Sequence, residues 1–526
     1  VLRDMLMSSH RAALSFMERA LCAEDEIALL KRTLFGRSSE KRPSKKDKQP
    51  PSMSEVFDEA VVDDNEIDDE ILSESVALDE AVASNASAQT HDNTTPKDRP
   101  KRGRKSLPVE FVRENIIHDL ADAEKICMCG CQLSKIGEET SEQLELIPAR
   151  LVVLRHVRLK YACKACGEGV ITAPMPKQPI PKGIPTAGLL AHVAVAKFDD
   201  HLPLYRQSEI WDRLGVNLPR STLSAWILKM GALLQPMIPL LQNHIIKSGY
   251  VNADETTAQV LKEPGRAPTA TSYMWVYMTG SHAQTSIVYE YQPTRHGDHA
   301  KTFLNDFKGT LQTDGYSGYH AVTGSEEVIS AGCWAHARRK FHEVWVVLKK
   351  DGAASKALEI IGKLYAVERY AVEQTFTIDQ IKTYRQEMSK PILDAFHTWL
   401  ISIRPKAPPK SPLAKAINYT LNQWEPLNRY LEDGQLSIDN NAAERQIRPF
   451  TVGRKNWLFM GSVEGAQAAS VLYSLIETAK ANDLNPEEYL THLLKNIPTT
   501  TPDTLHTLVP WHVKLPSTAE RAACKK

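Results

Sequence analysis

Three acidic residues stand where they could bind metal ions together. Asp254 and Asp314 each lie in or at the end of an apolar, strand-like run, and Glu444 lies in a short helical stretch. Three carboxylates that converge can hold two divalent cations, the arrangement that performs in-line phosphodiester chemistry. A lone glutamate is more often a solvated surface residue, so the hypothesis depends on all three acids. They are predicted to be catalytic metal ligands.

Cationic residues surround the third acid. Asp439 is predicted to cap the helix that carries Glu444, and Pro449 is predicted to bound it. The candidates for clamping DNA phosphates are Arg445, Arg448, Arg454 and Lys455. Trp457 is a candidate for stacking on an unpaired base, although a core tryptophan is the commoner outcome.

Four motifs carry a resemblance to a known family. They are DET at 254–256, TDGYSGY at 313–319, GCWAHARRKF at 332–341 and IDNNAAERQIRPFTVGRKNWLF at 438–459. Together they resemble the TnpC-type DDE transposase of the IS-sixty-six group of bacterial insertion sequences, from about Leu30 to Trp511. The resemblance implies a DNA transposase that binds the ends of its element, cleaves DNA and joins the 3′ ends to target DNA. The implied cofactor is Mg²⁺ or Mn²⁺.

The charge balance indicates a polyanion partner. The 526 residues carry 64 basic and 64 acidic side chains, but residues 50–96 contain 13 acids and no Lys or Arg. The rest of the chain therefore has 64 basic against 51 acidic residues, a net charge of +13, as expected of a DNA-binding protein. No apolar run is expected to span a membrane, and no signal peptide is evident. These features predict a cytoplasmic, nucleoid-associated protein without a membrane partner.

The N-terminal part is predicted to be a helix followed by a linker. Apolar and small residues of 1–41 recur in alternating steps of three and four, which indicates a coiled coil and a homo-oligomer, or a helix docked on its own domain. Residues 42–106 are predicted to be a disordered acidic linker that ends in a basic arm. Arg102, Arg104 and Lys105 in this arm could bind phosphates or a narrow minor groove.

Cysteines indicate a zinc-binding, ribbon-like module at 107–175, because five of the eight lie between 127 and 166. The predicted Zn²⁺ ligands are Cys127, Cys129, Cys163 and Cys166, with Cys131 as a possible substitute. A strand-like run over Leu151–Leu159 is expected between the two clusters.

Residues 176–247 are predicted to be helical and to bind DNA. A helix that ends near Leu214, a break at Gly215, and a second helix from Arg220 form a helix-turn-helix pattern. Arg220, Ser221 and Thr222 are the candidate DNA-contacting residues. An ordinary helical hairpin has the same pattern.

The fold class is multidomain, with an α/β RNase H-like catalytic core at 248–465. Strands are expected at 249–261, 272–279, 285–292, 310–314 and 327–332, with a helix at about 297–307. A helical insertion is expected at about 340–430, and a helical cap and tail at 466–526. Cys333 and His336 could bind a metal, but one pair offers too few ligands, so they are interpreted as a structural or DNA-facing corner.

Three alternatives remain. A DNA-binding regulator without catalysis would keep the basic arm, zinc module and helix-turn-helix, and a metal-dependent nuclease would share the acids but never join strands. A paired-carboxylate glycosidase has no use for a third acid beside DNA-binding modules. The family resemblance also suggests accessory proteins of the same element as partners.

Overall fold

The computed structural model describes residues 152–161, 171–280, 284–348 and 352–515. The predicted N-terminal helix, acidic linker and basic arm with Arg102, Arg104 and Lys105 lie outside these residues. So do the cysteines of both clusters, Cys127, Cys129, Cys131, Cys163 and Cys166.

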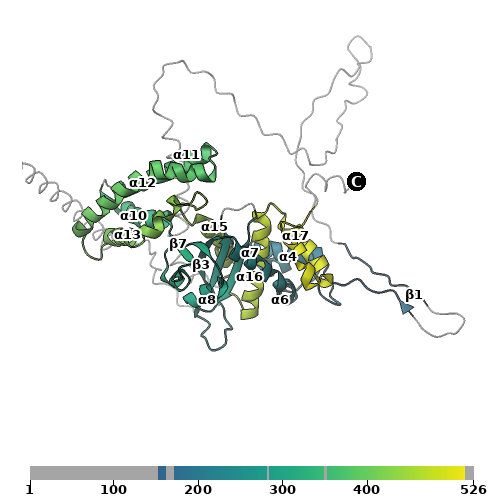
Figure 1. The fold of residues 1–526 in the computed structure, drawn as a ribbon. Helices are drawn as coiled ribbons and strands as arrows, with labels where there is room; N and C mark the ends of the chain where they lie inside the picture. The colour runs from purple at the N-terminus through teal and green to yellow at the C-terminus, as the bar shows by residue number, and fades with distance from the viewer. Residues whose placement is uncertain (1–151, 162–170, 281–283, 349–351, 516–526) are drawn as a thin grey trace, which may run out of the picture. The chain divides into compact units, whose positions relative to one another are not determined.

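A five-stranded mixed sheet lies at the centre of the described chain (Figure 1). Its strands are β3 (Tyr250–Gln259), β4 (Thr271–Thr279), β5 (Ile287–Gln292), β6 (Gly309–Gln312) and β7 (Val328–Ala331). Their order is β5-β4-β3-β6-β7, and β4 runs opposite to the other four. Aromatic and β-branched residues fill β4, as expected of a strand buried within a sheet. All five strands lie close to the positions that the apolar runs indicate.

The two faces of the sheet carry different helices. Successive residues of a strand face opposite sides, so Asp254 and Glu255 of β3 diverge. On the side of Asp254 lies α15 (Asn441–Trp457), and Asn252 of this face bonds to Asn440 just before that helix. On the side of Glu255 lie α8 (Gly297–Phe303) and the short helix η4 (Ser317–Tyr319). Tyr319 of η4 donates a hydrogen bond to Glu255 at 2.6 Å.

Helix α16 (Val463–Ala481) closes the β5 edge of the sheet. The hydroxyl of Ser474 accepts from the backbone N–H of Tyr289 at 2.8 Å. The hydroxyl of Thr478 accepts from the N–H of Ile287 at 3.0 Å and donates to its carbonyl at 2.9 Å. The amide of Asn482 bonds both backbone groups of Thr285. Side chains one helical turn apart thus replace the missing neighbouring strand and satisfy the edge.

Four helices precede the sheet and share its core. They are α4 (Ala187–Phe198), α5 (Leu204–Arg213), α6 (Arg220–Leu234) and α7 (Ile238–Lys247). Helix α6 packs on α16, and α4 packs on α17 (Pro486–Asn496). The run Arg220–Lys247 corrects the expectation about membrane spans, because by length and composition alone it could cross one. The fully buried Leu223, Met230 and Leu241 place its apolar side chains in the protein core instead.

A helical insertion follows β7 and has a core of its own. It comprises α10 (Trp334–Leu348), α11 (Ala353–Glu373), α12 (Ile378–Ile403), α13 (Pro412–Asn422) and α14 (Trp424–Asn428). Trp334, Phe341 and Phe396 are completely buried there. The insertion lies between Asp314 and Glu444 in the chain, which accounts for the long sequence gap between these acids.

One expected strand is not observed. In the described part of Leu151–Leu159, residues 152–159 have no regular structure, and pairing begins only between β1 (Lys160–Tyr161) and β2 (Ile171–Thr172). Val153 is 93% exposed, so this apolar run has no strand or core to pack against among the described residues.

Candidate active site

Asp254 lies in the middle of β3, opposite Val276 of β4. Its Oδ1 accepts the N–H of Glu255 at 2.8 Å. Burial, followed by the negative charges of Glu255, Asp314 and Glu444, raises the pKa of Asp254 well above its usual range. The charges that act on Asp254 thus include those of both other acids of the sequence hypothesis.

Asp314 lies two residues beyond β6, in a tight turn. Its Oδ1 accepts the N–H of Tyr316 at 2.8 Å, and its carbonyl accepts the hydroxyl of Tyr419 at 2.6 Å. Gly315, between Asp314 and Tyr316, has φ +85°, a conformation that L residues with side chains rarely adopt. The turn thus fixes the carboxylate at the end of the strand.

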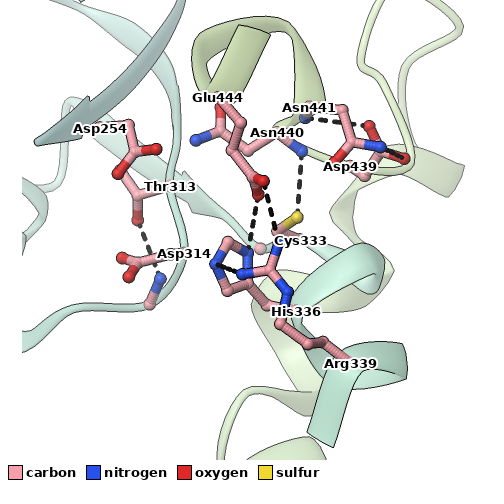
Figure 2. A network of polar contacts seen from close by, with 12 residues as sticks. Asp254, Thr313, Asp314, Cys333, His336, Arg339, Asp439, Asn440, Asn441 and Glu444 are labelled. Atoms are coloured by element: carbon pink, nitrogen blue, oxygen red, sulfur yellow. Dashed lines mark hydrogen bonds and ion pairs between the residues drawn. The ribbon is translucent and has the colours of Figure 1, made fainter. Parts of the chain in front are cut away.

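Glu444 lies in the first turn of α15 and meets two side chains of α10 (Figure 2). Arg339 donates from Nη2 to Oε2 of Glu444 at 3.0 Å. The Nδ1 of His336 lies 3.4 Å from Oε1 of Glu444. The helical insertion therefore supplies the immediate contacts of the third acid.

A buried amide network fixes α15 relative to the sheet. The Nδ2 of Asn440 donates to the carbonyl of Ala253 at 2.9 Å, directly before Asp254. Asn252 donates to Oδ1 of Asn440 at 2.8 Å and to Oε1 of Gln312 at 3.0 Å. Gln312 in turn donates to the carbonyl of Ser437 at 2.8 Å. These bonds link β3 and β6, which lead to Asp254 and Asp314, to the start of the helix that carries Glu444, and no local sequence pattern indicates them.

A second missed group lies on the opposite face of the sheet. The buried Glu255 accepts from Arg295 Nε at 2.7 Å and from Tyr319 at 2.6 Å. The guanidinium of Arg295 lies 3.8 Å from the ring centroid of Tyr316. This group ties the DET motif to the TDGYSGY motif. The charged Arg295 explains how Glu255 is tolerated beside Asp254.

The structure changes the predicted bounds of the third-acid helix. Pro449 lies inside α15, which continues to Trp457, and Asn440 rather than Asp439 is its N-cap. A proline within a helix removes one backbone bond, here to the carbonyl of the exposed Arg445, where water can replace it. Asp439 still accepts the N–H of Asn441 at 3.1 Å.

The basic residues of α15 divide into two groups. Arg445, Arg448 and Lys455 are exposed and lie on the same helix as Glu444. Arg454 instead donates to Oγ1 of Thr257 on β3 at 2.7 Å. Trp457 is partly buried and packs edge-on against Phe450, with ring centroids 5.5 Å apart.

The candidate DNA-reading residues begin helix α6. Arg220 and Ser221 are exposed and Thr222 is half-buried. Gly215 at φ +82° turns the chain between α5 and α6, and Ser208 of α5 donates to the carbonyl of Leu218 at 2.8 Å. This arrangement leaves the start of α6 accessible.

The site has the donors that a divalent cation needs. Three carboxylates come from β3, the end of β6 and α15, and hard cations such as Mg²⁺ prefer oxygen ligands. The buried Oε1 of Glu444 has no hydrogen-bond partner among the described residues. The fold is thus α/β, and the candidate site in it carries three carboxylates.

The comparisons identify the family. A model described as the transposase IS66 family matches residues 182–468, and an IS66 C-terminal element matches 474–511. The zinc-finger binding domain of transposase IS66 matches 124–167, and a model described as transposase C of IS166 homeodomain matches 23–116. The chain belongs to the IS66 transposase family, the IS-sixty-six group that its motifs resemble.

Curated relatives span most of the chain. The uncharacterized protein y4jD of Sinorhizobium fredii is 35% identical over 441 residues, which cover 80% of this chain and 85% of the relative. The uncharacterized protein y4hP of the same organism is 32% identical over 481 residues, 87% of this chain and 85% of the relative.

Family membership confirms the multidomain organisation, with an N-terminal helical domain, a zinc-finger module and a DDE transposase domain. It makes DNA the partner class, and it implies divalent-metal use together with zinc binding.

Proposed function

We propose that this chain binds the ends of its insertion sequence, cleaves DNA there and joins the freed 3′ ends to target DNA. The observation that carries the proposal is that Asp254, Asp314 and Glu444 come from three separate elements to one region of the fold, where the negative charges of the other two acids contribute to the raised pKa of Asp254. The strand order, with one antiparallel strand among four parallel ones, supports an RNase H-like core.

Asp254, Asp314 and Glu444 would hold two Mg²⁺ or Mn²⁺ ions. When bound, such ions lower the pKa of the attacking water or 3′ hydroxyl and stabilise the leaving oxygen. The burial and mutual repulsion that raise the pKa of Asp254 favour cation binding, because a cation relieves both. The amides of Asn252 and Asn440 keep the acids in register before the ions arrive.

Several basic residues would hold the DNA around this centre. Arg445, Arg448 and Lys455 project from α15 and would bind phosphates near the scissile bond. Arg454 already bonds to Thr257, so a phosphate contact of this residue would have to compete with that bond. Trp457 would stack on an unpaired base only if its packing on Phe450 loosens.

Specificity and assembly would come from the N-terminal half. Arg220, Ser221 and Thr222 would read the element ends, and Arg102, Arg104 and Lys105 would add phosphate contacts. Cys127, Cys129, Cys163 and Cys166 would hold a structural Zn²⁺, with Cys131 as the substitute ligand. The N-terminal helix would pair copies of the chain on nucleoid DNA, alone or with accessory proteins of the element.

A strand-transfer assay tests the proposal. The full chain, a DNA fragment that carries both element ends, a target plasmid and Mg²⁺ should give nicks at the ends and joined products. A matched fragment with scrambled ends should give neither product. Nicks without joining would reassign the chain as a nuclease, and end binding without nicks would reassign it as a regulator.

A further inference from the structure

A second group of metal-ligating side chains lies beside the three acids. Cys333 directly precedes α10, His336 lies in the first turn of α10, and Glu444 comes from α15 (Figure 2). One potential ligand atom from each of the three lies within 4.8 Å of the others. Glu444 therefore supplies the third ligand that Cys333 and His336 lack in the sequence.

Two of these atoms make no hydrogen bond. The Nδ1 of His336 and the Oε1 of Glu444 are buried and have no hydrogen-bond partner among the described residues; they lie 3.4 Å apart, an ion pair only when the imidazole is protonated. Buried polar atoms without a partner are uncommon and point to a missing ion or water.

The surrounding contacts suit a ligated cation. The backbone N–H of Asn440 donates to Sγ of Cys333 at 3.1 Å and so orients this fully buried side chain. Arg339 donates to Oε2 of Glu444 at 3.0 Å and leaves Oε1 available, as outer partners of ligating carboxylates do. The Nη1 of Arg339 also lies 3.4 Å from Nε2 of His336. If Nδ1 binds the metal, the ring proton of His336 lies on Nε2. Nε2 then cannot accept a hydrogen bond, so the distance between it and Nη1 of Arg339 has to increase.

The donor types select the metal. Thiolate, imidazole and carboxylate oxygen together are typical of zinc, whereas Mg²⁺ prefers oxygen alone. Three protein ligands leave one position for water, which distinguishes this group from a closed structural site.

We propose that Cys333, His336 and Glu444 form a Zn²⁺ site adjacent to the catalytic acids. Its consequence rests on the proposed function, because Glu444 belongs to both groups. A zinc ion that holds the Glu444 carboxylate withdraws it from the Mg²⁺ site, so zinc inhibits DNA nicking in competition with magnesium.

The test counts zinc in the full-length chain. Zinc bound at equilibrium is measured against a chromophoric chelator for wild type, Cys333→Ser, His336→Gln and the control Cys22→Ser. Each ligand variant should bind one zinc fewer than wild type. If the last zinc still binds, its affinity should fall by more than the about 10–100-fold loss that is typical when a residue that only contacts a metal ligand is changed. Cys22→Ser should equal wild type. Any zinc bound by the cysteine-rich module contributes equally to the zinc count of every variant, so it does not affect the comparison with wild type.

An unchanged zinc count and affinity in both ligand variants would overturn the site. If a variant fails to fold, anomalous diffraction at the zinc edge of wild-type crystals decides, since a peak between Cys333 and His336 is expected and its absence refutes the proposal. In the nicking assay, more Mg²⁺ should restore zinc-inhibited wild-type activity, and inhibition that Mg²⁺ leaves unchanged contradicts the competition. Failure of the proposed function would remove nicking altogether but leave the zinc count intact.

Discussion

Asn252 donates a hydrogen bond to Asn440 at 2.8 Å, although 188 residues separate them in the chain. Asn252 belongs to the strand that carries Asp254, and Asn440 caps the helix that carries Glu444. Both side chains are buried, so water does not compete for the bond. The relative position of the two acids therefore depends on neutral amides that themselves bind no metal.

Replacing Asn440 with aspartate should impair nicking without abolishing DNA binding. The new carboxylate cannot donate to the carbonyl of Ala253, and an unpaired buried group costs about 1–3 kcal/mol. We expect a nicking rate reduced at least about tenfold, since 1.36 kcal/mol of barrier corresponds to that factor. Single-turnover nicking and end-binding titrations measure the two effects. The control is Asn496→Asp, whose amide bonds only within its own helix region, to the carbonyl of His492 at 2.8 Å. Equal nicking rates for both variants would contradict the positioning role.

Neutralising the proposed metal ligands should abolish nicking. Asp254→Asn, Asp314→Asn and Glu444→Gln each remove one charge and keep the side-chain shape, so end binding should persist while Mg²⁺-dependent products disappear. Glu290→Gln is the matched control, because Glu290 is a buried carboxyl of β5 outside this group. Near-normal nicking by Glu444→Gln would remove Glu444 from the catalytic set.

The bonds between α16 and β5 should protect the edge strand. Thr478→Val keeps the side-chain shape but leaves the N–H and carbonyl of Ile287 unpaired, at a cost of about 1–3 kcal/mol. Hydrogen exchange at Ile287 and Tyr289 should accelerate. Thr491→Val should leave these amides unaffected, because its hydroxyl bonds the carbonyl of Glu487 in α17. Unchanged exchange in Thr478→Val would show that the edge is protected by packing alone.

Glu290 should make stability depend on pH. Burial raises the pKa of its carboxyl from 4.5 to about 7, so the folded chain binds this proton more tightly than the unfolded chain does. Its stabilising contribution is fully present below pH 4.5 and is lost as pH rises through 7. The unfolding midpoint of Glu290→Gln minus that of wild type should therefore increase as the pH rises from roughly 5 to 8. A difference that does not vary with pH would place the carboxyl in water.

Two DNA-contacting regions should respond differently to mutation. Arg102→Ala with Arg104→Ala should weaken binding to all duplexes and flatten its dependence on salt, because phosphate contacts carry no sequence information. Changes at Arg220 or Ser221, at the exposed start of α6, should instead reduce discrimination between element ends and random DNA. Equal losses of affinity for both DNAs at the α6 positions would make that segment an ordinary helical hairpin.

Local patterns predicted the five strands, because strand periodicity is visible within short windows. They also indicated the three acids, whose role as metal ligands stays a prediction. The partners of those acids were not visible. Arg339 and Glu444 are 105 residues apart, and only folding of the insertion brings them together. Pro449 misled for a related reason: a local rule predicts a helix end, whereas Phe450 and Gly453 are buried in the core and hold the helix through the proline. The membrane-length run at Arg220–Lys247 is not evident from local patterns, because its prolines interrupt the apolar residues without ending the helical run.

The pairing of α16 with β5 makes chain length, in addition to the polar side chains themselves, a sensitive property of this region. Four helical residues advance about 6 Å and two strand residues about 6.6 Å, so Ser474, Thr478 and Asn482 stay in step with Tyr289, Ile287 and Thr285. A single inserted or deleted residue between Ser474 and Asn482 turns the later side chains by about 100° around the helix, away from the strand. Hydroxyl exchanges such as Ser474→Thr keep the donors and acceptors in place. Natural variation in this stretch should therefore consist of substitutions at constant length, with insertions and deletions confined to the loops that follow Asn482.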